Sequence, residues 1–156
     1  MTRSRVWQQP AWYVYPAGRL RFIAELRACS VHAVPTRINR AHRRHRGGFQ
    51  VGFGLTVPGL PPRHVRIVFA GIGSVPFVYV DGPAESPHRY SDGSLCMWYP
   101  YDPESSRWTR REGAAALLGH ITAHLIREEW WRKTGEWVGD EAAHDEEDNM
   151  DGMKIA

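Results

Sequence analysis

The chain has few cysteines and no long hydrophobic run. Cys29 and Cys96 are the only cysteines among its 156 residues, and no C-x-x-C pair occurs. Two such thiols are too few for a disulfide scaffold or a zinc module. The longest apolar segment, residues 67–80, is interrupted by two glycines and a proline, so we do not expect it to span a membrane. With 42% hydrophobic and 24% charged residues, the composition fits one soluble domain that folds without a metal or a disulfide.

An export signal is missing, and lysine is scarce. Residues 1–10 contain arginines but no apolar h-region and no small-residue cleavage site, so we expect the protein to stay in the cytoplasm. The lysines are Lys133 and Lys154, against 18 arginines.

Charge is unevenly distributed along the chain. Residues 1–46 hold ten arginines and one acid, whereas the remainder holds ten basic and sixteen acidic residues. Seven of those acids lie within residues 140–154, Asp140 included. This acidic end is expected to be a flexible tail at 145–156. The remainder is expected to be one domain over residues 16–144, the extent of the resemblance given below, with an N-terminal extension at 1–15.

The first half of the chain predicts a helix and an antiparallel sheet. Phe22, Leu26 and Cys29 recur at helical spacing within residues 19–29, which places Cys29 in the core. Alternating apolar residues then predict strands, with turns rich in proline and glycine between them. The expected strands are 31–38, 51–57, 65–69 and 77–80, joined as a four-stranded meander.

The second half predicts a long loop and another helix. Residues 82–108 have no sustained period, and a loop of this length in a compact domain is usually functional. Thr109 and Glu112 form a capping box ahead of an apolar stripe, so we expect a helix over residues 110–132. The predicted fold class is α+β, with a helix, a meander, a long loop and a helix in that order.

The loop contains a histidine and a cysteine that a turn would bring together. Pro87 favours an extended residue before it, and Asp92-Gly93 is a strong turn signal. We therefore expect the chain to fold back and place His88 near Cys96. A free thiol titrates near ~8.5, and its thiolate is a strong nucleophile. Cys96 is a candidate nucleophile, and the alternative is a small buried core residue.

This loop resembles the signature of ubiquitin-conjugating enzymes, and more closely that of their bacterial relatives. In those relatives a Pro-His-x-Tyr-x-Asp-Gly-x-Leu-Cys run is followed by a tryptophan, a helix and a Gly-x-Trp-x-Gly-x-Glu-x-x-His ending. This chain has the run at 87–96, Trp108, and the ending at 135–144. Ser86 stands where eukaryotic members have a histidine that buttresses the turn, and His88 stands at their asparagine. The resemblance covers residues 16–144 and implies the ubiquitin-conjugating fold.

The resemblance implies that Cys96 transfers an acyl group in two steps. The thiol takes up the C-terminal carboxyl of a partner protein as a thioester, and a lysine amine of a target then attacks it. A thiol does not displace a carboxylate, so an adenylating partner enzyme has to activate the carboxyl group. His88 would either stabilise the oxyanion or take a proton from the amine, and the sequence leaves both roles open.

Four more loop residues are expected to support this site. Pro87 and Gly93 match the proline and the glycine of the family signature. Asp92 and Asp102 are most simply a turn residue and a solvated residue, and the alternative is that either one orients the attacking lysine.

The bacterial relatives are encoded in antiphage operons, notably the cyclic-oligonucleotide systems called CBASS. There the acyl donor is the C-terminus of the CD-NTase, the nucleotidyltransferase that makes the signal, so the resemblance implies a CD-NTase as partner. Two alternatives stay open. The donor could be a bacterial ubiquitin-like protein, or the chain could be an inactive module of the same fold that binds an acidic partner or nucleic acid.

The remaining clusters of polar residues point to a partner surface rather than to a metal or a cofactor. His120 and His124 are four residues apart on the second helix but lack the third ligand that zinc needs. Arg43, Arg44 and Arg46 belong to a basic run that is either a solvated hairpin tip or a contact for an acidic partner. Nucleic acid is unfavoured as a partner, because the run contains no aromatic residue for stacking.

Overall fold

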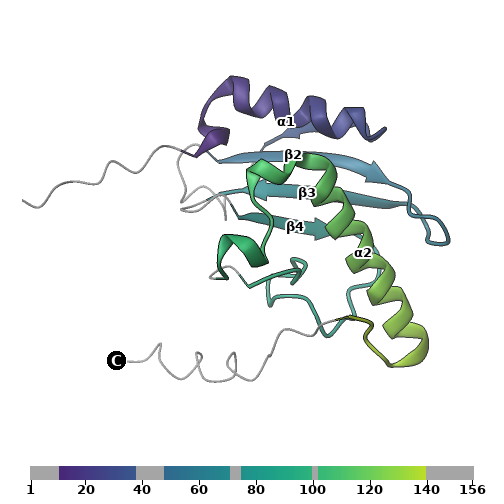
Figure 1. The fold of residues 1–156 in the computed structure, drawn as a ribbon. Helices are drawn as coiled ribbons and strands as arrows, with labels where there is room; N and C mark the ends of the chain where they lie inside the picture. The colour runs from purple at the N-terminus through teal and green to yellow at the C-terminus, as the bar shows by residue number, and fades with distance from the viewer. Residues whose placement is uncertain (1–10, 38–47, 71–74, 100–101, 140–156) are drawn as a thin grey trace, which may run out of the picture.

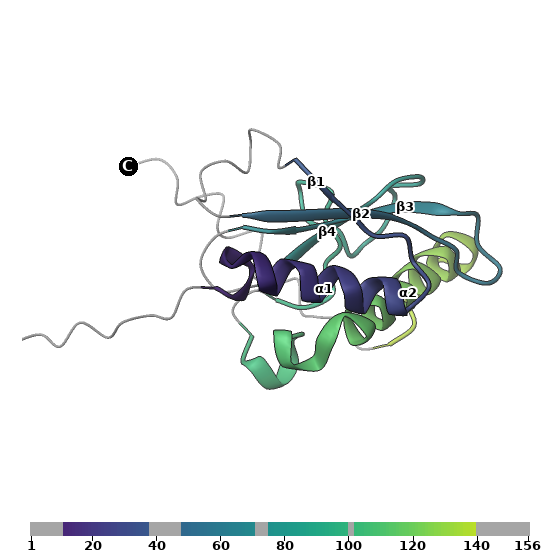
Figure 2. The ribbon, with the colours of Figure 1, turned by 90° about the horizontal axis from the view of Figure 1, so that it is seen from above.

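The fold is a four-stranded sheet with two helices packed on one of its faces (Figure 1, Figure 2). The computed structural model describes residues 11–37, 48–70, 75–99 and 102–139. Seen along the sheet, both helices lie on the same side, and the described residues place no helix on the other face (Figure 2). The predicted combination of an antiparallel sheet and two helices is confirmed.

The sheet is an antiparallel meander. Its strands lie in sequence order, each paired with the next: β1 (Val34–Thr36), β2 (Phe49–Leu55), β3 (Arg63–Phe69) and β4 (Pro76–Val80). Side chains alternate between the faces of a strand, so Val51, Phe53 and Leu55 of β2 all point into the core. The alternation in the sequence therefore predicted the sheet and its order correctly.

α1 (Pro16–Ala28) packs on the sheet through Phe22, Ile23 and Leu26, which are all buried. Pro16 begins the helix, at a position where the missing N–H removes no helical hydrogen bond.

Cys29 does not lie in the core, and the prediction that it does is wrong. The thiol is exposed. The helix ends at Ala28, Cys29 caps it, and Ser30 takes a left-handed conformation with φ 64° that turns the chain away. The helical spacing that relates Cys29 to Leu26 therefore no longer holds at position 29.

α2 (Gly113–Thr134) is preceded by the expected capping box. The Thr109 amide donates to the Glu112 carboxylate at 2.7 Å, and together the two residues cap the single-turn η4 (Arg110–Glu112). Gly135, with φ 77°, ends α2 in the left-handed conformation that glycine adopts without strain. The helix predicted to follow the box is confirmed to within one turn.

Glu25 connects the two helices. Its carboxylate accepts hydrogen bonds from Arg110 Nη1 and Nη2 at 3.0 and 2.9 Å and from the amide of Ala114 at 3.1 Å. Burial by itself would raise the Glu25 pKa, but these donors and the charge of Arg110 outweigh it and lower the pKa. The start of α2 is thereby fixed against α1.

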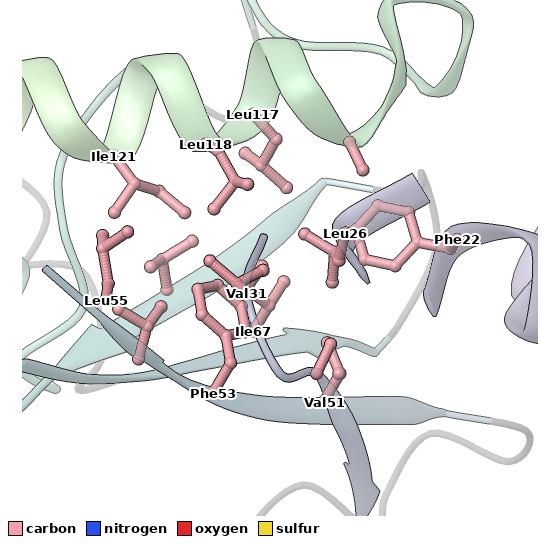
Figure 3. Close-up of a cluster of buried hydrophobic side chains, with 14 of the residues drawn as sticks. Phe22, Leu26, Val31, Val51, Phe53, Leu55, Ile67, Leu117, Leu118 and Ile121 are labelled. Atoms are coloured by element: carbon pink, nitrogen blue, oxygen red, sulfur yellow. The ribbon is translucent and has the colours of Figure 1, made fainter. Parts of the chain in front are cut away.

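The core fills the space between the helices and the sheet (Figure 3). Apolar side chains of both helices meet those of the central strands, among them Phe22, Leu26, Val51, Phe53, Ile67, Leu117 and Ile121. An aromatic cluster with ring centroids 4.8 to 6.4 Å apart extends this core and consists of Trp12, Phe22, Phe49, Phe69 and Trp108.

The packed part of the chain begins before α1. The short η1 (Trp12–Val14) buries Tyr13 to 3% exposure. Residues 11–13, which the sequence assigned to an extension, thus contribute to the core, whereas Val14 and Tyr15 are exposed. The acidic tail expected at 145–156 lies outside the described residues.

The segment after β4 is an irregular loop, as the sequence predicted. Within the described residues 81–99 and 102–109, regular structure is limited to a bridge between Arg89 and Leu95 and to η3 (Glu104–Ser106). The Leu95 amide donates to the carbonyl of Val78 at 2.9 Å, which attaches the loop to the edge of β4. Among the described helices there is no candidate for a membrane-spanning segment.

Candidate active site

Residues 88–96 fold back as a small hairpin. The Cys96 amide donates to the carbonyl oxygen of His88 at 3.0 Å, and the Tyr90 amide donates to the carbonyl oxygen of Ser94 at 2.9 Å. Gly93 sits in the turn with φ 86°, a conformation that disfavours any residue with a Cβ. The prediction that this turn brings His88 near Cys96 is confirmed.

Ser86 braces the beginning of the hairpin. Its hydroxyl oxygen accepts a hydrogen bond from the His88 amide at 3.1 Å, across the exposed Pro87. A serine can therefore fix this turn locally, at the position where the resemblance led us to expect a buttressing histidine.

A cavity of about 150 Å³ opens beside Cys96. Its walls come from the hairpin, from α2 and from the segment after α2: His88, Cys96, Met97, Gly119, His120, Ala123, His124, Arg127 and Trp137. Cys96 itself is partly exposed where it lines this cavity.

Trp137 packs over two histidines of the cavity. Its ring centroid lies 4.2 Å from that of His88 and 5.4 Å from that of His124. His88 and His124 are only 4% and 3% exposed. The His88 imidazole is therefore held in place by an aromatic side chain from the segment that follows α2.

A buried carboxylate anchors the hairpin to α2. Glu128 is fully buried and accepts hydrogen bonds from Arg89 Nε at 2.8 Å, Arg89 Nη2 at 2.9 Å and Arg132 Nη2 at 3.0 Å. His124 Nε2 lies 3.4 Å from the same carboxylate. Burial alone would raise the Glu128 pKa, but the donors and the positive charge of Arg89 outweigh it and lower the pKa to about 2.

The two aspartates considered as supporting residues lie in turns and do not line the cavity. Asp92 Oδ1 accepts from the amide and the hydroxyl of Ser94 at 2.9 and 2.6 Å, and its Oδ2 accepts from the Tyr79 hydroxyl at 2.9 Å. Burial, followed by the hydrogen bond and charge of Asp92, raises the pKa of Tyr79 to about 12. Asp102 Oδ2 accepts from the Tyr99 amide at 3.0 Å.

The other predicted sites divide between this cavity and undescribed parts of the chain. His120 and His124 both line the cavity, and no group of three or more potential metal ligands occurs among the described residues. Arg43, Arg44 and Arg46 lie outside the described residues.

Sequence reasoning did not identify Arg127 or Glu128 as site residues, and it named Trp137 only as part of the ending at 135–144. The sequence pattern could have identified Glu128. It follows Leu125 by three positions and so lies on the apolar face of α2. A carboxylate on such a face is buried and needs a partner of opposite charge. Nothing in the pattern around Arg127 points to a cavity.

The comparison with protein families supplies a match that covers most of the chain. A family model described as "Type II CBASS E2 protein" matches residues 36–145, which include the whole hairpin, α2 and Trp137. The searches of curated proteins and of solved structures found no match.

Proposed function

This chain belongs to the type II CBASS E2 family, and from that premise we propose that it is a conjugating enzyme whose Cys96 carries a protein C-terminus as a thioester. The observation that carries the proposal is the position of Cys96. Its sulfur-bearing side chain is partly exposed at a cavity, at the end of a hairpin that places His88 beside it. A structural cysteine would be sealed in apolar surroundings and inert.

The proposed reaction is two successive acyl transfers. First, the Cys96 thiolate forms a bond to the activated carbonyl carbon of the donor, and the leaving group departs with the electrons of the bond that breaks. The leaving group is an adenylate or the thiolate of an activating partner enzyme. Second, the amine nitrogen of a target lysine bonds to that carbon, the thiolate of Cys96 leaves, and the amine gives up its proton.

The donor that we propose is the C-terminus of a CD-NTase. The family belongs to CBASS, and the resemblance of the hairpin to conjugating enzymes implies a donor with a free C-terminus. A bacterial ubiquitin-like protein is the competing donor, and the two are distinguished by offering each separately.

His88 is the residue that we propose to act on the reacting carbonyl or the amine. A donor to an oxyanion is worth roughly 3 to 4 kcal/mol of transition-state stabilisation in enzymes of this chemistry. The two roles can be separated, because asparagine donates a hydrogen bond but does not accept a proton as a base. If His88→Asn keeps most of the rate of thioester discharge and His88→Ala loses it, His88 stabilises the oxyanion. If both variants lose the rate equally, His88 acts as the base.

The thioester itself is tested by incubating the protein with an activating enzyme, ATP and a candidate donor. A conjugate that dithiothreitol cleaves is expected, and Cys96→Ser converts it to an ester that survives reduction. Cys29→Ser is the matched control, because Cys29 is the more exposed thiol and lies at the end of α1, away from the cavity.

Two results would overturn the proposal. If Cys29→Ser abolishes the adduct and Cys96→Ser does not, the site is wrong. If neither donor gives a reducible adduct with any activating enzyme from the same operon, the chain acts as a binding module of this family.

A further inference from the structure

The walls of the cavity beside Cys96 carry basic groups and no acidic one among the described residues. Arg127 has a permanent positive charge, and the imidazoles of His88, His120 and His124 line the cavity. Nε2 of His124 also lies 3.4 Å from the Glu128 carboxylate. Within the described part of the chain, no ion pair joins Arg127 to a carboxylate. The next residue, the buried Glu128, by contrast lies against Arg89, His124 and Arg132. Within residues 102–139 and the other described ranges, the charge of Arg127 is therefore not offset by a paired carboxylate.

The local backbone keeps the Arg127 guanidinium at the cavity. A Cβ placed on Gly139 would lie 3.2 Å from three atoms of that guanidinium, and Gly139 has φ 110°, which L-residues with side chains rarely adopt. The chain after α2 therefore passes close over the guanidinium only because a glycine stands there. The same short segment places Trp137 against His88. It therefore contacts both the Arg127 guanidinium and the His88 imidazole.

The size of the cavity limits what it can hold. A volume of about 150 Å³ corresponds to roughly five water molecules at about 30 Å³ each. It admits a group the size of a phosphate or a terminal carboxyl.

We propose that this cavity is an anion-binding pocket that receives a small oxyanion, a carboxylate or a phosphate group, next to the Cys96 sulfur. The inference rests on the proposed function of Cys96 and adds the chemistry that the site recognises. Arg127 and His120 at the exposed rim attract the anion, and the same positive charge opposes a lysine ammonium.

The test uses two alkylating reagents of nearly the same size, anionic iodoacetate and neutral iodoacetamide. Both transfer a carbon to the thiolate with departure of iodide, and both act without donor or activating enzyme. In the Cys29→Ser protein, Cys96 is the single thiol. We expect its iodoacetate-to-iodoacetamide rate ratio to exceed that of 2-mercaptoethanol by about threefold to tenfold at low salt, and to fall as salt screens the charge.

Variants assign the effect to Arg127. Arg127→Ala is expected to return the ratio towards that of 2-mercaptoethanol, whereas Arg127→Lys keeps most of it. Arg111→Ala is the matched control, since Arg111 is an exposed arginine that pairs with Glu104 and does not line the cavity. Protection of Cys96 from iodoacetamide by inorganic phosphate or by acetate then distinguishes a phosphate group from a carboxylate.

A ratio equal to that of 2-mercaptoethanol overturns the proposal, and so does a raised ratio that Arg127→Ala leaves unchanged. Failure of both anions to protect Cys96 overturns it as well. None of these results depends on the reducible adduct, so the anion pocket can fail while Cys96 still forms a thioester, and the reverse.

Discussion

Glu128 on α2 and Arg89 of the hairpin form a buried ion pair, with Arg89 Nε 2.8 Å from Oε1 and Nη2 2.9 Å from Oε2. Their side chains are 0% and 8% exposed. Arg89 directly follows His88, so this pair connects the hairpin to a regular element over 39 positions of sequence. A segment with almost no secondary structure of its own is thereby held rigidly beside α2.

Replacing Glu128 by glutamine should destabilise the protein strongly. The substitution leaves the buried Arg89 without its counter-charge, and removing one partner of a buried pair costs about 3 to 5 kcal/mol. The free energy of unfolding from urea titration measures this. Glu129→Gln is the control, because Glu129 pairs with Arg132 and Lys133 at the surface, where such pairs contribute at most about 1 kcal/mol. Equal losses in the two variants would show that the buried pair does not hold the hairpin.

Acid should remove the contribution of Glu128. Its pKa is about 2 in the folded protein against an ordinary 4.5, so the unfolded state binds the proton more readily. The stabilisation is complete above about pH 4.5 and is lost as the pH falls towards 2, and a shift of this size corresponds to about 3 kcal/mol. We expect the stability difference between the native protein and Glu128→Gln to be smaller at pH 3 than at pH 6. A difference that stays constant would contradict the lowered pKa.

Trp137→Leu should slow the discharge of the Cys96 conjugate more than it lowers stability. The indole holds the His88 ring at a centroid distance of 4.2 Å, and misplacing a catalytic group by about 1 Å can cost up to a hundredfold in rate. The single-turnover rate with a lysine acceptor measures this loss. Trp130→Leu is the control, because Trp130 is 49% exposed and does not line the cavity. If both variants discharge at the native rate, Trp137 has no positioning role.

Replacing a glycine by alanine should change the stability of the protein in opposite directions at two positions, one within α2 and one at its end. Gly119 is an exposed helical residue, and the position that a Cβ would take there is open space, so Gly119→Ala should stabilise the protein by up to about 1 kcal/mol. Gly135 ends the helix with φ 77°, and Gly135→Ala should cost about 1 kcal/mol or more. Thermal unfolding resolves these effects as shifts of roughly 2 to 4 °C of opposite sign. Shifts of the same sign would contradict the left-handed cap.

The sequence by itself determined the order of the elements and the hairpin. The alternation of apolar residues in β2 and β3, the capping box at Thr109 and the Asp92-Gly93 turn are local signals, because each depends on residues within a few positions of one another. The closeness of His88 and Cys96 follows from that turn alone. The wrong prediction for Cys29 shows the limit of local periodicity, since the spacing does not reveal that the helix ends one residue earlier.

Tertiary structure alone decided what surrounds the sulfur. Arg127, Trp137 and Glu128 meet the hairpin across 31 or more positions, counting from Cys96 to Arg127, and no spacing rule connects residues so far apart. Their meeting depends on how α2 lies on the sheet and how the chain turns back after Gly135. The sequence identified a candidate nucleophile. The charge, the size and the walls of the cavity beside it form only when those distant segments pack together.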